Sequence, residues 1–243
     1  LPRLRSLDFL RGVMLVIMTV DHLDLYGPIY RFTFETFGFA SAAEGFVLLS
    51  GLVAGVVYAG YAERGVLSVR VRSRLWLLWR FHAVVVLVLL ASRWWRPELR
   101  PAGGMSEAAT AAVGGLLLLN QEPPLDILPL YLLMVALLPL ALVGFRRGHA
   151  ALVLAASAGV WMADQWLSLS GAYPPTIAFT VGDWPVRWLP NHFHAGAWQF
   201  LFVGGVWCGW RWREKDRWLV RARGARALAC GVAGAFVLSL LRH

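Results

Sequence analysis

The sequence predicts an all-α membrane protein, a polytopic bundle of about seven transmembrane helices with its N-terminus in the cytoplasm. Of its 243 residues, 58% are hydrophobic and only 15% are charged, whereas soluble domains carry about 25% charged residues. Long apolar stretches recur along the chain, and basic residues gather in every second connection between them. Thirteen Trp and six Tyr also suit membrane–water interfaces, where both residue types are enriched.

The individual spans follow from length, because a helix needs about 20 apolar residues to cross the hydrocarbon core. Segment 111–119 is too short to cross alone and stops before Pro123-Pro124, so we interpret it as a half-helix or re-entrant piece. The whole chain, residues 1–243, is predicted to be one membrane domain, and the odd number of spans suggests further C-terminal helices. The predicted spans are 8–27, 44–62, 75–92, 125–145, 150–169, 196–211 and 225–241.

The basic residues set the orientation. Fifteen Lys and Arg lie in the segments assigned to the cytoplasm, against five in the segments assigned to the other side. This bias follows the positive-inside rule. The net charge of +9 would indicate nucleic acid in a soluble protein. Here the bilayer is the predicted partner, and nucleic acid is not. The cytoplasmic segments are 1–7, 63–74, 146–149 and 211–226, and the opposite ones are 28–43, 93–124 and 170–195.

Ionisable residues within the first span are the strongest sign of function, because such side chains face a bundle interior or a water-filled cavity. Arg11 and His22 are eleven positions apart, about three turns and roughly 16 Å of rise, and therefore share one helix face. Arg11 is expected near the cytoplasmic entrance, and His22 in the outer half. Taken alone, snorkelling of Arg11 and an interfacial role for His22 explain the pattern equally well.

A carboxylate beside His22 would fix its tautomer and stabilise the imidazolium, as in a general base. Glu44 opens the second span and would lie level with His22 if the two helices pair antiparallel. Asp21 and Asp24 compete for the same role. Small residues after Glu44, Ser50 among them, are explained by close helix packing.

Further polar groups divide between the two sides of the membrane. Arg70, Arg72 and Arg74 precede the third span and are either positive-inside charge or a clamp for a phosphate-rich ligand. On the outer side, four polar residues are predicted to surround His22 and bind an acceptor or an oxyanion: Asp126, Tyr131, Asn191 and Gln199. His192 and His194 lack a third ligand that the sequence can name, so no metal site is predicted.

Several of these residues occur together in a known family. The sequence Leu7-Asp-Phe-Leu-Arg11-Gly12, followed by Asp21-His22, resembles the Arg-x10-His motif of the acyltransferase-3 family of membrane acyltransferases. Glu44-Gly-Phe-Val-Leu-Leu-Ser50-Gly51 and the later segments 125–131 and 198–204 are similar to its OpgC-type branch. The resemblance covers residues 3 to about 210.

The resemblance implies transfer of an acyl group from cytoplasmic acyl-CoA to hydroxyls of a periplasmic or cell-surface glucan. For the OpgC-type branch it implies a succinyl group, with succinyl-CoA as the donor. Acyl-CoA is then a co-substrate and no cofactor is bound permanently, in a multi-pass protein of the bacterial inner membrane. His22 matches the catalytic histidine and Arg11 its motif partner, while Arg72 and Arg74 resemble the basic cluster associated with the acyl donor. The alternative is a proton-coupled transporter or flippase that uses the same in-span charges as a relay.

Overall fold

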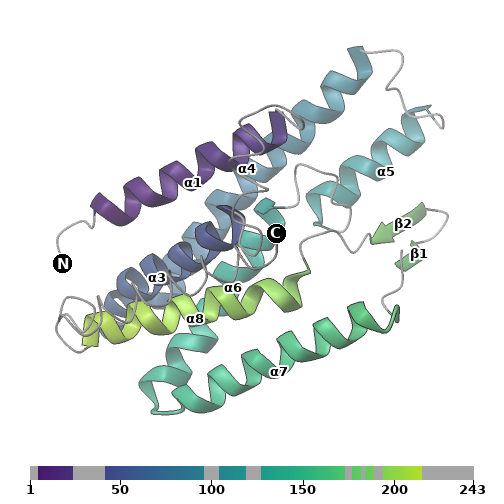
Figure 1. Ribbon diagram of the computed structural model, residues 1–243. Coiled ribbons are helices and arrows are strands. Elements are labelled where there is room, and N and C mark those ends of the chain that lie inside the picture. Colours follow the sequence, from purple (N-terminus) through teal and green to yellow (C-terminus); the bar gives the residue numbers. More distant parts are fainter. Residues whose placement is uncertain are drawn as a thin grey trace, which may run out of the picture. The chain divides into compact units, whose positions relative to one another are not determined.

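The computed structural model describes residues 5–23, 42–95, 104–118, 127–172, 177–181, 184–188 and 194–214. They form two compact units, one within residues 1–67, 140–157 and 198–243 and the other within 68–139 and 158–197. In chain order the elements are α1 (Arg5–Leu23), α3 (Ala42–Glu63), α4 (Leu67–Trp95), α5 (Gly104–Leu116), α6 (Ile127–Arg146), α7 (Ala150–Leu169), β1 (Ile177–Val181), β2 (Trp184–Trp188) and α8 (Ala195–Glu214) (Figure 1).

Four of the described helices, α3, α4, α6 and α7, are long and apolar enough to cross a membrane. Each overlaps a predicted span, although α4 begins eight residues before the predicted span 75–92. This confirms the helical, membrane-type architecture at this level. Helix α1 and helix α8 also form where spans are predicted. The count of seven spans and the cytoplasmic N-terminus stay predictions, and the predicted span 225–241 lies outside the described residues.

Large apolar side chains remain exposed on the helices that could cross a membrane. On α4, Phe81 and Val88 are both 60% exposed, and on α7 Leu152 and Met162 are 66% and 63% exposed. Soluble proteins rarely expose large contiguous apolar patches. Such surfaces are expected where a helix faces lipid rather than water.

An antiparallel hairpin lies in the connection between α7 and α8, and the all-α prediction omits it. Strands β1 and β2 pair from Ile177↔Trp188 to Val181↔Trp184. Their Ile, Phe, Thr, Val and Trp residues favour strands, and Gly182-Asp183 between them is typical of a two-residue hairpin turn. From the sequence, this stretch was predicted only as a polar connection, because strands of five residues are far below the length of a span.

Two short connections between helices are fixed by glycines in the left-handed region. Gly65 has φ 72° and Gly148 has φ 82°. After α3, Val66 N donates to Tyr61 O at 3.0 Å; after α6, His149 N donates to Gly144 O at 2.9 Å. This is the Schellman motif, which satisfies terminal carbonyls and stops the helix. Helices α4 and α7 can therefore begin almost at once.

Helices α3 and α8 pack through glycines, and the two run side by side in Figure 1. A Cβ on any of the four glycines would collide with a backbone carbonyl of the opposite helix. Small residues at such positions let two backbones approach closely, as in membrane helix pairs. The contacts are Gly51 with Phe202, Gly55 with Val206, Gly205 with Leu48, and Gly209 with Leu52.

Candidate functional site

Helix α1 carries Arg11 against helix α3. The guanidinium carbon of Arg11 lies 5.5 Å from the centroid of the Phe46 ring, within the range of a cation–π contact. Arg11 is half-buried, and its Nε is buried without a hydrogen-bond partner among the described residues. A guanidinium nitrogen in this state can donate to an oxygen of a bound ligand.

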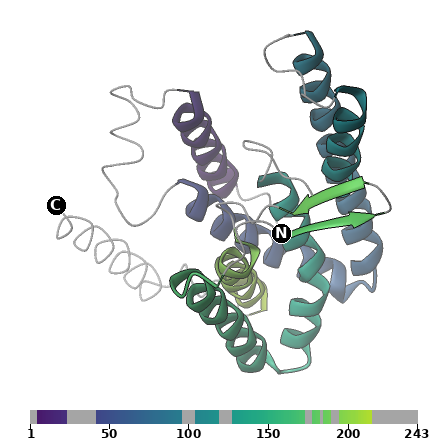
Figure 2. The same cartoon turned by 90° about the vertical axis from the view of Figure 1, so that its right-hand side faces the viewer.

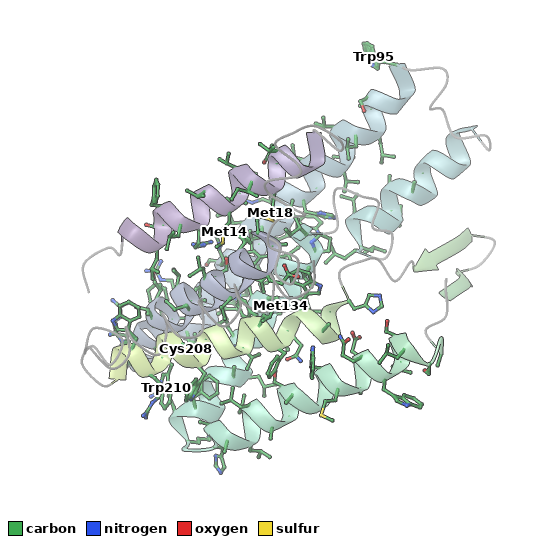
Figure 3. The ribbon with its side chains drawn as sticks, in the orientation of Figure 1. Met14, Met18, Trp95, Met134, Cys208 and Trp210 are labelled. Atoms are coloured by element: carbon green, nitrogen blue, oxygen red, sulfur yellow. The ribbon has the colours of Figure 1, made fainter. Side chains whose placement is uncertain are left out.

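Asp21 and His22 belong to the last turn of α1, but their side chains lie outside the described part of the chain. The described backbones correct one expectation about them. Met14, in the middle of α1, meets Gly45 at the start of α3, with its side chain labelled in Figure 3. His22 lies eight residues, about 12 Å of helix rise, beyond Met14. Glu44, next to Gly45, therefore lies beside the middle of α1 and not beside His22 at its end.

Ser50 of α3 has a feature that packing alone does not explain. Its side chain is 1% exposed, and its hydroxyl has no hydrogen-bond partner among the described residues. Ser50 lies one turn after Phe46, on the same side of α3, so the aromatic ring that Arg11 contacts and this hydroxyl share a helix face. The sequence signal was a hydroxyl within an apolar stretch, which close helix packing alone had explained.

The predicted arginine clamp divides between two faces of α4. Arg70 and Arg74 are about 40° apart around the helix, whereas Arg72 lies about 160° away from each of them. Arg72 is exposed and Arg74 is half-buried. Arg72 shares its face with Trp76, which is 56% exposed and stacks on Trp79 with ring centroids 5.0 Å apart. The three arginines therefore do not form a single fork.

Helix α5 (Gly104–Leu116) overlaps the short helical piece predicted at 111–119 and begins seven residues earlier. Side chains of α4 bind its carboxyl end. His82 Nε2 lies 2.9 Å from Gly115 O, and Trp79 Nε1 donates to Leu116 O at 3.0 Å. Both views show the two helices alongside each other (Figures 1 and 2). These bonds satisfy terminal carbonyls of a helix too short to span a membrane. His82, which is 1% exposed, has this anchoring role.

The predicted acceptor residues are only partly described. Asp126 and Asn191 lie outside the described residues, and Tyr131 is half-buried on α6. Gln199 of α8 is 7% exposed and bonds Ser157 of α7 twice. It accepts from the Ser157 hydroxyl at 2.7 Å, and its Nε2 donates to Ser157 O at 2.8 Å. These contacts give Gln199 a role in packing α7 against α8; its role toward an acceptor stays a prediction.

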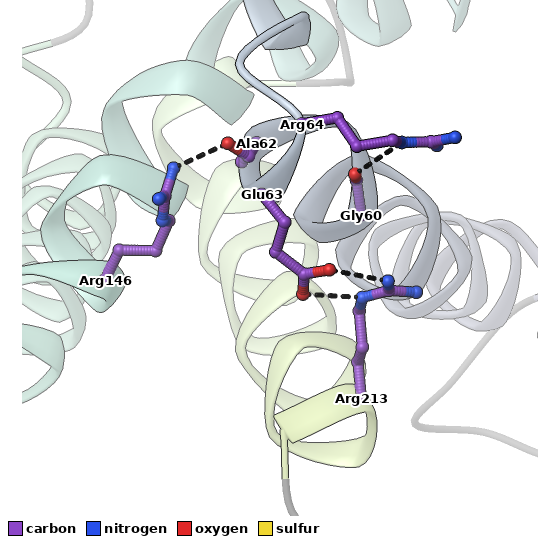
Figure 4. A network of polar contacts seen from close by, with 6 residues as sticks. All are labelled: Gly60, Ala62, Glu63, Arg64, Arg146 and Arg213. Carbon is purple, nitrogen blue, oxygen red and sulfur yellow. Dashed lines mark hydrogen bonds and ion pairs between the residues drawn. The ribbon is translucent and has the colours of Figure 1, made fainter.

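A polar network at the carboxyl end of α3 escaped the sequence analysis (Figure 4). Arg213 of α8 binds both carboxylate oxygens of Glu63, at 2.8 and 2.7 Å, and this bond raises the pKa of Arg213. Arg146 donates to Ala62 O at 2.8 Å. Cations at this end of a helix are favourable, and the two arginines tie α6 and α8 to α3. Their basic character alone had indicated only membrane orientation.

Comparison with known protein families identifies nearly the whole chain. None of the curated proteins and none of the solved structures compared matches it. The family model described as OpgC protein matches residues 3–243, which include Arg11, His22 and the arginines of α4. The resemblance predicted from the motifs is thereby confirmed. The chain belongs to the OpgC family, a family of membrane-associated acyltransferases that modify glucans.

Proposed function

We propose that this protein moves a succinyl group from cytoplasmic succinyl-CoA to hydroxyls of a periplasmic or cell-surface glucan, in the bacterial inner membrane. The match of the OpgC family model over residues 3–243 carries the proposal. The succinyl group, CoA as the donor and the compartment are details that we propose beyond this match. Four helices able to cross a membrane supply the setting that a reaction between two aqueous compartments needs.

On the donor side, the arginines at the start of α4 bind the phosphates of CoA. Guanidinium groups suit phosphates because they donate in a planar, bidentate fork. CoA carries a pyrophosphate and a separate ribose phosphate. Arg70 and Arg74 lie on one face of α4 and Arg72 on another. We assign the two faces to the two phosphate positions of one CoA molecule.

Toward His22, the pantetheine arm passes along the paired helices α1 and α3. The support is the pair of buried polar atoms that have no hydrogen-bond partner among the described residues, Arg11 Nε and the Ser50 hydroxyl. Leaving a buried polar group unpaired costs about 1–3 kcal/mol. A ligand oxygen, such as an amide or thioester carbonyl, would satisfy the Arg11 donor. The unpaired Nε therefore supports a role for Arg11 in binding the pantetheine arm of the donor.

At the reacting centre, His22 takes the proton of a glucan hydroxyl while that oxygen attacks the thioester carbonyl. The new C–O bond forms as the C–S bond breaks, and the proton passes from His22 to the departing CoA thiolate. Asp21, another candidate carboxylate, orients the imidazole. Tyr131, Asn191, Gln199 and Asp126 are the candidates for holding the sugar or the oxyanion, where one donor is worth about 10²–10³-fold in rate.

Binding of succinyl-CoA tests the donor side without requiring turnover. We expect saturable binding to the purified protein, measured by isothermal titration calorimetry. Arg72→Ala and Arg74→Ala should each weaken it by about tenfold or more, because each removes a charge-assisted hydrogen bond.

Arg147→Ala is the matched control, since it removes the same charge from an exposed position outside α4. Equal weakening by all three variants would reduce the effect to net charge and contradict the donor site. Proton-coupled uptake by a wild-type protein that does not bind succinyl-CoA would favour a transporter instead.

A further inference from the structure

An aspartate–histidine pair lies outside the residues used so far. Asp164 belongs to α7 and His194 immediately precedes α8. His194 Nδ1 is 3.7 Å from Asp164 Oδ2, within ion-pair range when the imidazole is protonated. The sequence separates these residues by thirty positions, so no local motif announces the pair. From the sequence alone, His194 was considered only with His192, as two histidines that lack a third metal ligand.

The burial of the two side chains is unequal. The side chain of Asp164 is 6% exposed and that of His194 is 24% exposed. A carboxylate within a candidate membrane span is costly to bury without partners and marks a functional site by default. Here the carboxylate lies inside, and the imidazole that it faces reaches the surface. In many enzymes a buried carboxylate behind a histidine orients the imidazole toward a substrate in the same way.

The backbone of α8 is shaped around the carboxylate. A Cβ built on Gly196 would lie 2.6 Å from Asp164 Oδ1, so any other residue there would displace the carboxylate or the helix. Gly196 is in the first turn of α8, where the helix dipole favours a negative charge. The glycine and the helix terminus together explain why a carboxylate is stable at this buried position.

The pair also has a defined place along α7. Asp164 lies fourteen residues, about 21 Å of rise, after Ala150, where α7 begins. Arg146 ends α6 and Arg147 follows it, just before α7, and the positive-inside rule assigns both to the cytoplasm. Asp164 is therefore near the other end of α7, and His194 is at the matching end of α8. On the proposed orientation this is the glucan side.

We propose that His194, positioned by Asp164, is a binding site for a sugar hydroxyl of the glucan acceptor. In the neutral imidazole, the ring nitrogen on the side away from Asp164 can accept a hydrogen bond, and a glucan offers many hydroxyl donors. His194 is the residue that contacts the sugar, and Asp164 is a positioning residue. The inference rests on the proposed function for the identity of the acceptor, but not for the existence of the pair.

Equilibrium binding of the acceptor tests the proposal without acyl transfer. The probe is a preparation of soluble gluco-oligosaccharides from bacterial envelope glucan, titrated into the purified full chain in lipid nanodiscs. His194→Ala should weaken binding by about tenfold, the worth of one good hydrogen bond. Asp164→Asn should weaken it less, and the double variant should match His194→Ala alone because both changes act through one contact.

The second readout is the steady-state rate of glucan acylation. His194→Ala should raise the KM for the gluco-oligosaccharide about tenfold with kcat and succinyl-CoA binding little changed, and His194→Asn should restore part of the loss. His149→Ala, an exposed histidine beyond the opposite end of α7, should change neither constant.

Unchanged oligosaccharide binding in His194→Ala, with normal acyl transfer by the wild type, overturns this inference and leaves the proposed function standing. A fall in kcat and thermal stability without any change in KM also overturns it, because that result indicates a structural role. Wild-type protein that binds succinyl-CoA and neither binds nor acylates the oligosaccharides contradicts the proposed function and this inference together.

Discussion

Replacing His22 by alanine is expected to lower the rate of glucan acylation by about 10²–10⁴-fold, the usual worth of general-base catalysis. The variant removes the group that accepts the hydroxyl proton. It leaves untouched the arginines of α4 that bind the donor. Its affinity for succinyl-CoA should therefore equal that of the wild type, and the protein should still insert in the membrane. The measurement is the initial rate of acyl transfer in proteoliposomes, with insertion checked by carbonate extraction.

His149→Ala is the control for this result, because His149 is exposed in the connection between α6 and α7. It removes an imidazole and should leave the rate unchanged. Acylation at close to the wild-type rate in His22→Ala would exclude His22 as the base. A loss of succinyl-CoA binding together with activity would assign His22 to donor binding instead.

Replacing Gly209 by valine is expected to have the largest effect on stability. Any Cβ at Gly209 would collide with the carbonyl of Leu52 on α3, and a backbone atom cannot move aside as a flexible side chain can. Overpacking of this kind costs typically about 1–3 kcal/mol, and here two helices must separate. The midpoint of thermal unfolding in detergent, followed by circular dichroism, measures the effect.

Gly204→Val provides the matched control on the same helix. A Cβ at Gly204 meets no atom within 4 Å, while the change in helix propensity is the same at both positions. The difference between the two variants therefore isolates the contact between α3 and α8. Equal unfolding midpoints for the two variants would contradict the close glycine packing of these helices.

The fold was predictable where a simple physical rule applies along the chain. Length and apolarity predict α3, α4, α6 and α7, and Pro123-Pro124 predict that the preceding helix stays short. This rule does not predict the hairpin at 177–188, because its strands are much shorter than a membrane span. The turn dipeptide Gly182-Asp183 was not considered. A search for turn signals in the 170–195 connection would have found it.

The candidate site was harder to predict, since it depends on how helices meet. One helix places Arg11 and His22 on one face, and that needs only helical periodicity. The level of Glu44 depends on the offset between α1 and α3, which sequence does not give. Adjacent arginines such as Arg72 and Arg74 look like one cluster in sequence, yet helical geometry places them on different faces. The contact of Asp164 with His194 needs the packing of α7 against α8.

The most direct test of the central claim is the mass of the glucan after incubation with the purified wild-type protein. The protein is reconstituted in proteoliposomes and supplied with succinyl-CoA and envelope glucan, and the glucan is analysed by mass spectrometry. A membrane-bound glucan O-acyltransferase predicts glucan species heavier by whole succinyl groups, absent when succinyl-CoA is omitted or when His22→Ala replaces the wild type. Glucan of unchanged mass, from a protein that binds succinyl-CoA normally, would contradict the account.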